Sequence, residues 1–285
     1  MSSNGEHSDI SNVLIATDGS AHAAAAVEYG AWLAAQARAR ATVLHVIDAR
    51  RLAGHFINHF SEIIGNGHGP GFAARVRDYY HARGRQALAL AAAICKHYDV
   101  ACRTELKTGN VVELLVASSA RADLLVLGQH GEDEERETGF LGSVAEKVVR
   151  KVARPVLLAQ PPFRELRRAL LAYDGSDAAR RAMWALARLA ALLSMEIDAV
   201  ELVEWNEPTT ALSEVPRYFK NLPVRVSAHY LTGDSLKVIL NHARDEECDL
   251  LAMGAYADQT AERLALGSTT EYLMRHSSVP VLVHH

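Results

Sequence analysis

The sequence LLVLGQHGEDEERETGFLGSVAEKVV, residues Leu124–Val149, carries the clearest structural signal in the chain. It begins with an apolar run that ends abruptly at Gly128, which is typical of a buried parallel strand. An acidic loop follows, and Gly142 and Ser143 then open a helical pattern. Ser143 and Glu146 have the S-x-x-E spacing of a capping box. The segment is therefore predicted to run from a strand through a glycine-rich turn into the N-terminus of a helix.

Such a turn gathers unpaired backbone N–H groups at the start of a helix. These donors and the helix dipole both favour a negative charge, so the turn is suited to binding an anion. A plainer interpretation is also open at this point: Ser143 caps its own helix and the glycines only turn the chain.

The same order of elements occurs twice in the chain. Asp-Gly-Ser follows an apolar run at Asp18 and again at Asp174, and a later apolar run ends at Gly128 and again at Gly254. The repeated segments are Leu14–Ser20 with Leu170–Ser176, Thr108–Asn110 with Thr232–Asp234, Ala122–Gly128 with Cys248–Gly254, Gly142–Glu146 with Gly267–Glu271, and Arg154–Leu158 with Val279–Val283. A period this long indicates duplicated domains, because the repeats of a solenoid are far shorter.

The two copies differ in length between their second and third strands. The Asp-Gly-Ser motifs are 156 residues apart, whereas the glycines that end the fourth strands are only 126 residues apart. The second copy is therefore about thirty residues shorter. We expect it to lack the long helix predicted at Phe72–Tyr98 and to have the proline-containing segment Glu204–Pro223 in its place.

Apolar strand-like runs alternate with helical patterns in both copies. In the first copy the predicted strands are Val13–Thr17, Thr42–Ile47, Val100–Leu106, Leu124–Leu127 and Val156–Ala159. This alternation is typical of βαβ units, which give a parallel sheet with helices on both faces. The sequence therefore predicts an α/β fold of two tandem doubly wound domains. Their predicted limits are a tail at 1–11, a first domain at 12–160, a linker at 161–168 and a second domain at 169–285.

The composition indicates a globular chain of 285 residues, with 49% hydrophobic and 22% charged residues. A net charge of −4 argues against a general nucleic-acid or anionic-membrane binder. Residues 1–11 lack the apolar core of a signal peptide, and no run is long enough to span a bilayer. Cys95, Cys102 and Cys248 form no C-x-x-C pair and indicate reduced thiols. We therefore expect a cytoplasmic protein.

With these residues the chain resembles the tandem universal stress protein (UspA-like) family. The resemblance rests on A-x-D-G-S after the first strand, HVID at His45–Asp48, GSVAE at Gly142–Glu146, and the duplication of the pattern from Asn12 to the C-terminus. It implies a five-stranded parallel sheet in each half and a pseudo-dimer of the two halves, and it is compatible with a further homodimer. It also implies that Val156–Ala159 and Val281–Val283 pair antiparallel, so that neither strand edge is left open.

The resemblance further implies an ATP-binding loop of the pattern G-x2-G-x9-G-[ST]. The first copy has Gly128, Gly131, Gly142 and Ser143, but with ten residues where the pattern has nine. The second copy keeps the nine and has Ala257 in place of the second glycine. We expect the first copy to be the better site, because the Ala257 methyl group would strain the turn and crowd the phosphates.

The site residues implied by the resemblance surround an adenine nucleotide. Asp18 would approach the adenosine, and the Val46 backbone would meet the adenine. The phosphates would lie against Gly128, Gly131, Gly142, Ser143 and Val144, and the corresponding residues of the second copy are Asp174, Leu202, Gly254, Gly267 and Ser268. This placement agrees with the rule that open parallel sheets bind ligands beyond the carboxyl ends of their strands. The expected ligand is ATP or a related adenine nucleotide, with or without Mg²⁺.

The acidic run Glu132–Glu135 lies between these glycines. Several carboxylates near a phosphate would cost about 1–2 kcal/mol in water, which is roughly tenfold in affinity. A divalent cation would reverse the sign of this effect. A solvated loop that points away from any ligand is the alternative.

Other candidate sites are weaker. His55, His59 and Glu62 have metal-ligand spacing, but they lie in the least regular region, where a surface or packing role is favoured. His45 lies inside a predicted strand and is expected in the core or at an interface. The sequence has no Walker lysine, G-x-S-x-G elbow or H-E-x-x-H motif.

The sequence therefore predicts an adenine-nucleotide-binding stress-response protein that acts as a sensor or regulator through an unknown protein partner. Any ATP hydrolysis is expected to be slow. The alternative is a nucleotide-free scaffold in which both loops serve as structure and partner surface. An adenylate-forming enzyme is disfavoured, because no signature lysine or histidine motif accompanies the glycines.

Overall fold

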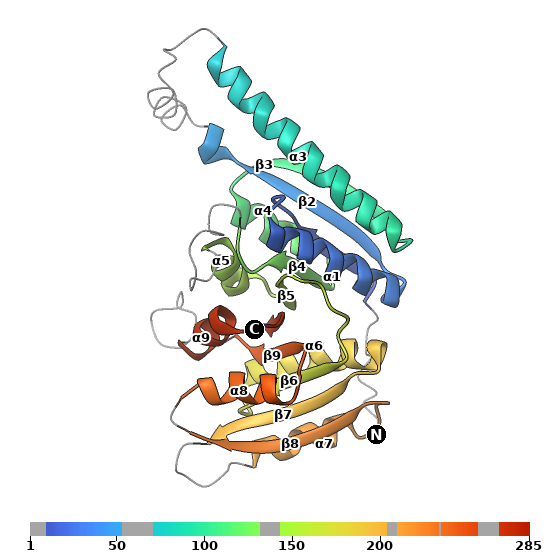
Figure 1. The fold of residues 1–285 in the computed structure, drawn as a ribbon, viewed down its shortest axis with the longest axis vertical. Helices are drawn as coiled ribbons and strands as arrows, with labels where there is room; N and C mark the ends of the chain where they lie inside the picture. Colours follow the sequence, from blue (N-terminus) through green and yellow to red (C-terminus); the bar gives the residue numbers. More distant parts are fainter. Residues whose placement is uncertain (1–9, 53–70, 132–142, 204–209, 234, 256–267) are drawn as a thin grey trace.

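The computed structural model describes residues 10–52, 71–131, 143–203, 210–233, 235–255 and 268–285. The first half contains β1 (Asn12–Ala16), α1 (Ala21–Ala37), β2 (Arg40–Asp48), η1 (Ala49–Leu52), α3 (Phe72–His97), β3 (Cys102–Gly109), α4 (Val111–Ser119), β4 (Leu124–Gly128), α5 (Ser143–Lys151) and β5 (Val156–Ala159). The second half contains β6 (Arg168–Ala172), α6 (Asp177–Leu193), β7 (Glu196–Val203), η2 (Ala211–Ser213), α7 (Glu214–Phe219), β8 (Arg225–Thr232), α8 (Lys237–Asp245), β9 (Leu250–Gly254), α9 (Ser268–His276) and β10 (Val281–His284). Figure 1 shows the first half in blue to green and the second half in yellow to red.

The ten strands of the described chain form one sheet in the order β3-β2-β1-β4-β5-β10-β9-β6-β7-β8. Neighbouring strands are parallel within each half, whereas β5 and β10 are antiparallel, with Leu157 opposite Leu282. Both halves therefore have the same strand order, mirrored across the central β5–β10 pair (Figure 1). The predicted α/β fold and the predicted antiparallel pairing of the two edge strands are confirmed.

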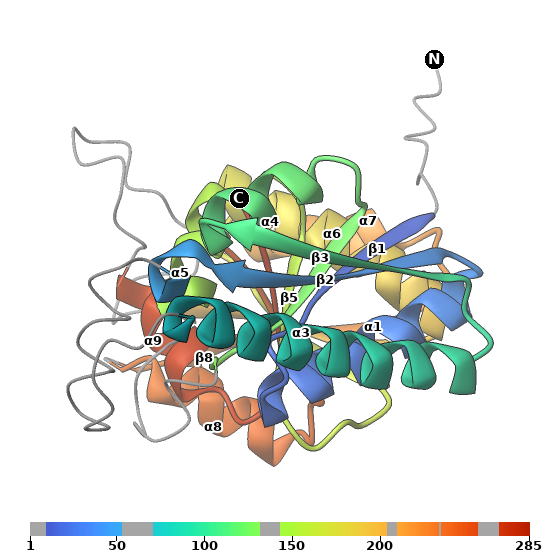
Figure 2. The same cartoon turned by 90° about the horizontal axis from the view of Figure 1, so that it is seen from above.

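Helices cover both faces of this sheet (Figure 2). α1, α3, α6 and α7 pack on one face, onto which Val13 and Ile15 of β1 point. α4, α5, α8 and α9 pack on the other face, onto which Leu14 and Leu44 point. Alternate side chains of each strand are thus buried on opposite faces, which explains the nearly continuous apolar runs in the sequence. Both core clusters include residues from both halves, so the halves share their cores.

The Asp-Gly-Ser motif builds the same turn in both halves. In the first half the Asp18 carboxylate accepts a hydrogen bond from the Ser20 N–H at 2.9 Å, and the Ser20 hydroxyl oxygen accepts one from the Ala23 N–H at 3.1 Å. The intervening Gly19 has a φ of 87°, a left-handed conformation that favours glycine. Ser20 is thereby the N-cap of α1. Asp174, Gly175 and Ser176 repeat this geometry before α6.

The glycines that end β4 and β9 allow close contact with helices α1 and α6. A Cβ atom on Gly128 would lie 2.8 Å from the backbone carbon of His22. A Cβ atom on Gly254 would lie 2.6 Å from the backbone carbon of Ala178. Any side chain at these positions would therefore push the strand end away from the helix start.

The structure differs from the predicted elements in the bounds of the third strand and in the details of the segment that precedes this strand in the second half. The second half lacks the long helix, as predicted. The described part of the segment that replaces this helix contains a short helix, the six-residue α7, which was not predicted. β3 ends at Gly109 and not at Leu106, because its pairing with β2 continues as far as Asp48. Within the described ranges, no helix is both long and apolar enough to cross a membrane.

Candidate functional site

A cavity of about 200 Å³, cavity 1, opens at the carboxyl ends of β1, β2 and β4. The strand order changes direction between β1 and β4, which is where open parallel sheets bind ligands. The predicted nucleotide-binding residues that line the cavity are Asp18, Val46, Gly128, Gly131, Ser143 and Val144. Another predicted site residue, Gly142, lies outside the described residues.

The interior of cavity 1 is largely apolar. Leu44 and Val46 of β2, Leu115 of α4 and Leu127 of β4 line it. Covering such a surface with a planar ring removes apolar area from water, which contributes roughly 25 cal/mol per Å². The interior is therefore suited to a flat, weakly polar group such as a heteroaromatic base.

The polar side of cavity 1 is formed by the turn after β1 and the first residues of α5. The Asp18 carboxylate is held in place by the Ser20 N–H. Ser143 is the first residue of the nine-residue α5, whose N-terminal end carries the positive pole of the helix dipole. The Glu146 carboxylate pairs with Arg150 one turn later. This side of the cavity therefore offers both a carboxylate and a helix start suited to an anion.

Three arginines that were not predicted as site residues also line cavity 1. Arg50 and Arg51 lie in η1, directly after β2, and Arg83 lies in α3. Arg50 pairs with Asp48 (Nη2 to Oδ2, 2.5 Å), which holds the pKa of that carboxyl below its usual value. The Arg51 guanidinium lies over the Tyr80 ring, 5.7 Å from its centroid. The signal available in the sequence was the position of Arg50 and Arg51 immediately after a parallel strand.

His45 is buried and lines cavity 1 from the side that faces α3. A Cβ atom on Gly84 would lie 2.9 Å from the His45 ring and 2.7 Å from the Leu106 side chain. Gly84 therefore lets α3 approach the sheet closely. This contact places the preceding residue, Arg83, at the cavity.

A second cavity of about 450 Å³, cavity 2, lies at the equivalent place in the second half. Asp174, Leu202 and Gly254 line it, so the structure also brings these predicted residues together. Ser268 opens α9, but its side chain and the whole of Gly267 lie outside the description. The start of α9 is tied to the sheet, because the Thr270 hydroxyl donates to the Gly254 carbonyl at 3.3 Å.

Cavity 2 has a different neighbourhood from cavity 1. Tyr173 stands where the first half has Thr17, and its hydroxyl donates to the Glu214 carboxylate at 2.6 Å. Arg180 donates to the same carboxylate at 3.0 Å. Burial and the bond to Glu214 raise the pKa of Tyr173, and the bond from Arg180 lowers the pKa of Glu214. Glu214 begins α7, so this network fixes the short helix against the sheet.

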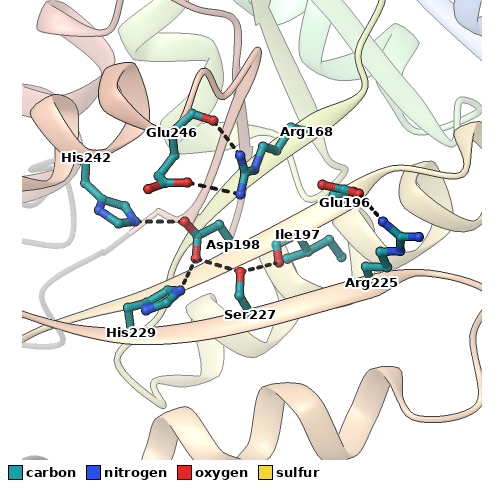
Figure 3. Close-up of polar contacts among 9 residues, drawn as sticks. All are labelled: Arg168, Glu196, Ile197, Asp198, Arg225, Ser227, His229, His242 and Glu246. Atoms are coloured by element: carbon teal, nitrogen blue, oxygen red, sulfur yellow. Dashed lines mark hydrogen bonds and ion pairs between the residues drawn. The ribbon is translucent and has the colours of Figure 1, made fainter.

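A second polar cluster of the second half joins residues of β7, β8 and α8 (Figure 3). Asp198 of β7, with 1% of its side chain exposed, lies 2.8 Å from His242 Nε2 and 3.3 Å from His229 Nε2. The Ser227 hydroxyl donates to the same carboxylate at 3.0 Å. The corresponding residue of β2 is Thr42, so the first half has no carboxylate at this position. The sequence analysis did not identify this cluster, because its members come from β7, β8 and α8.

Hydrogen bonds connect each half to the helix that borders the cavity of the other. Gln129, next to Gly128, is buried and donates to the Met274 carbonyl of α9 at 2.5 Å. In the opposite direction, the His285 ring bonds to the Val149 carbonyl of α5. α5 therefore begins beside cavity 1, and its C-terminal part contacts His285 of the second half. α9 begins beside cavity 2, and its C-terminal part contacts Gln129 of the first half.

Several residues considered from the sequence lie outside the described ranges. They are the acidic run Glu132–Glu135, the possible metal ligands His55, His59 and Glu62, and Ala257. Among the residues that the structure does describe, no group of three or more His, Cys, Asp and Glu side chains is placed to hold a metal ion.

Comparisons with known proteins agree on one family. Its model, the universal stress protein family, matches residues 10–56, 68–160 and 217–285. The chain is 27% identical over 282 residues to universal stress protein Slr1230 of Synechocystis, covering 95% of this chain and 98% of that protein. A solved universal stress protein from Archaeoglobus fulgidus has a TM-score of 0.75 at 21% identity, with 96% of this chain and 97% of that chain covered. A functionally unknown protein from Pseudomonas aeruginosa has a TM-score of 0.62 at 15% identity, with 96% and 92% covered.

Proposed function

The chain belongs to the universal stress protein family, and we propose that its first half binds an adenine nucleotide in cavity 1. The observation that carries the proposal is the convergence of Asp18, Val46 and the start of α5 on one cavity. These groups come from segments far apart in the sequence. Their meeting is therefore a property of the fold and not of one local motif.

Each part of an adenine nucleotide has a counterpart in this cavity. The base fits the apolar interior, where Val46 lies beyond the last residue of β2 that pairs with β1, so that its backbone groups on that side are placed to bond to the edge of the base. Asp18 is placed to accept hydrogen bonds from ribose hydroxyls. The phosphates fit the start of α5 and the Gly128–Gly131 turn, where backbone N–H groups and the helix dipole favour negative charge.

We further propose that the bound nucleotide is a signal and that its hydrolysis is slow at most. The described lining of cavity 1 includes the carboxylates of Asp18 and Asp48 but no lysine, and Asp48 is paired with Arg50. In this proposal any Mg²⁺ arrives with the nucleotide phosphates. The protein acts in the cytoplasm as a sensor or regulator of the stress response, through a protein partner that reads its nucleotide state.

Two other universal stress proteins with solved structures hold adenine nucleotides, cAMP in one and AMP in the protein from Arabidopsis thaliana. Their TM-scores against this chain are 0.40 and 0.34, which is too low to transfer their ligands. The proposal therefore rests on the chemistry of cavity 1.

The test is to fill each cavity separately. Ala16 ends β1 and lines cavity 1, and Ala172 ends β6 and lines cavity 2. We expect Ala16→Phe to weaken binding of ATP, AMP or cAMP at least tenfold in isothermal titration calorimetry, because the ring occupies the space of the base. Ala172→Phe is the matched control and should leave the higher-affinity binding unchanged. Unchanged binding in a folded Ala16→Phe protein would overturn the assignment to cavity 1.

A second pair of variants isolates the charge of Asp18. Asn in place of Asp18 or Asp174 keeps an oxygen to accept the Ser20 or Ser176 N–H, so both turns should remain intact. Asp18→Asn should weaken nucleotide binding, whereas Asp174→Asn should not. Mass spectrometry of ligand released from the denatured wild-type protein would identify which nucleotide the cavity prefers.

A nucleotide-free scaffold is the second candidate, and one observation favours it. Gly128 and Gly254 are both accounted for by their contact with α1 and α6, so these glycines alone need no phosphate. If neither calorimetry nor mass spectrometry detects a nucleotide bound to the wild-type protein, the results support the nucleotide-free scaffold and contradict nucleotide binding.

A further inference from the structure

The side of cavity 1 that faces α3 carries arginines that the contacts proposed for base, ribose and phosphates do not use. Arg51 of η1 and Arg83 of α3 both line the cavity and are half-buried. Arg50 lines it too, but its guanidinium is paired with the Asp48 carboxylate at 2.5 Å. The positive charge that this side adds to the cavity therefore comes from Arg51 and Arg83.

Helix α3 positions both of these arginines. Tyr80 and Arg83 are three residues apart on the helix, so their side chains lie on one face of it, and both line the cavity. The Arg51 guanidinium lies over the Tyr80 ring, 5.7 Å from its centroid, where the ring attracts the positive charge. Gly84, which follows Arg83, lets α3 lie against His45 of β2. The two charges are therefore held at the cavity by the packing of α3.

These arginines and the proposed phosphate site belong to opposite faces of the sheet. α1 and α3 pack on one face, whereas α4 and α5 pack on the other. Cavity 1 opens at the strand ends and is lined from both faces, by α3 and η1 on one side and by α4 and α5 on the other. It therefore has two places that favour an anion, the start of α5 and the pair Arg51 and Arg83.

The common adenine nucleotides can occupy only one of these two places with phosphate. ATP, ADP and AMP carry all their phosphates at the 5′ position of the ribose. The guanidinium group of arginine binds phosphate with two parallel N–H···O bonds, so Arg51 and Arg83 are suited to a further phosphate group. A ligand that matches both places needs a second phosphate that is separate from the 5′ position.

We propose that cavity 1 prefers an adenine nucleotide that carries a second phosphate on its ribose, at the 2′ or the 3′ position. The 5′-phosphate lies at the start of α5, and the ribose phosphate is bound by Arg51 and Arg83. One ribose hydroxyl remains to donate a hydrogen bond to Asp18. This inference rests on the proposed nucleotide binding, because it assigns a second contact of the same ligand.

The test compares ligands that carry the same number of phosphates in different places. Both phosphates of ADP are at the 5′ position, whereas adenosine 3′,5′-bisphosphate has one at each position. We expect the bisphosphate to bind the full-length protein at least about tenfold more tightly than ADP in isothermal titration calorimetry at low salt. This preference should decrease as the salt concentration rises, because it depends on charge. Adenosine 2′,5′-bisphosphate is the second ligand, and tighter binding than ADP by either isomer supports the proposal.

Variants of the two arginines test where the second phosphate binds. Arg51→Gln and Arg83→Gln each remove one guanidinium group, so each should lower the preference for the bisphosphate over ADP by about threefold to tenfold. Arg85→Gln is the matched control and should keep the preference. Arg85 lies on the exposed surface of the same helix and is not among the residues that line the cavity.

The outcomes separate this inference from the proposed function. Binding of ADP with no preference for either bisphosphate would overturn the inference and leave nucleotide binding in place. Failure of ADP and of both bisphosphates to bind would overturn both. A preference that survives undiminished in Arg51→Gln and in Arg83→Gln would show that the second phosphate binds elsewhere, which also overturns the inference.

Discussion

The two halves of the molecule build the same strand–turn–helix framework but cover the ends of their strands differently. In both halves an Asp-Gly-Ser turn caps a helix, and a glycine at the end of the fourth strand lets that helix come close. In the first half the 26-residue α3 brings Arg83 to cavity 1, where Arg50 and Arg51 also lie. In the second half the six-residue α7 takes its place, and Glu214 binds Tyr173 and Arg180.

Comparing the two halves distinguishes the residues that the fold needs from the residues that would contact a bound ligand. The features present in both halves satisfy backbone geometry, whereas the features present in one half decide the charge around each cavity. Cavity 1 is bordered by three arginines, whereas cavity 2 is bordered by Tyr173, whose hydroxyl is bonded to the Glu214 carboxylate. Duplication therefore preserved the framework and left the surroundings of the two cavities free to diverge.

The largest expected effect concerns the shared glycines. Gly128→Ala and Gly254→Ala should each destabilise the protein by about 2–3 kcal/mol, because the added methyl group meets the backbone of a helix and not a flexible side chain. The change is measured as a shift of the urea unfolding midpoint. Gly109→Ala is the control, since its methyl group would meet only the Leu114 side chain, which can move.

Similar losses at Gly128 and Gly254 would support a common structural role for both glycines. A large loss at Gly128 with a negligible loss at Gly254 would contradict it and would show that the framework is not equally tight in the two halves.

The next effect concerns the buried carboxylate found only in the second half. Asp198→Ala should cost about 1–3 kcal/mol, because it removes the carboxylate partner of the half-buried His242 and leaves Ser227 with only its 3.4 Å bond to the Ile197 carbonyl. The matched change in the first half is Thr42→Ala, which should cost less than about 1 kcal/mol. Both are measured by chemical denaturation. Equal costs would show that the cluster in Figure 3 adds nothing to the stability of the second half.

The sequence was sufficient to predict the framework, because the framework depends on local patterns. Asp18, Gly128 and Ser143 each belong to a short motif whose spacing predicts a turn or a helix start, and duplication made those motifs recognisable. The antiparallel pairing of Val156–Ala159 with Val281–Val283 was predictable from the family resemblance and is confirmed.

The surroundings of the cavities were not predictable, because they depend on how separate elements pack. Arg83 reaches cavity 1 only because Gly84 lets α3 lie close to His45. The Asp198 cluster likewise joins residues from three elements.

The smallest expected effect concerns two histidines whose rings contact the first half. His284 and His285 end the second half, where the first half has Ala159 and Gln160. Gln160 donates to the Ser277 carbonyl at 2.6 Å, and His285 makes the corresponding contact with the Val149 carbonyl. Burial lowers the pKa of both histidines below the ordinary value of 6.5, and the positive charge of Arg181 acts in the same direction.

The sign of the pH dependence follows from these lowered values. As the pH falls below 6.5, the unfolded chain takes up protons at these histidines before the folded protein does, so the free energy of unfolding decreases. Their contribution is complete above pH 6.5 and is lost as the pH falls through the folded pKa values. Asp48 and Glu214 act in the same direction only at lower pH, because their lowered pKa values start from 3.8 and 4.5.

Replacing both histidines by the residues of the first half removes this dependence while keeping a donor for Val149. The double variant His284→Ala/His285→Gln should therefore show a flatter stability profile between about pH 7 and pH 5.5 than the wild-type protein. Urea midpoints measured across this range give the comparison. The control is His276→Gln, because His276 lies on the exposed surface of α9 and should leave the slope unchanged. If the double variant kept the wild-type slope, the acid sensitivity would have to arise away from this interface, and the two halves would be joined equally well at every pH in the range.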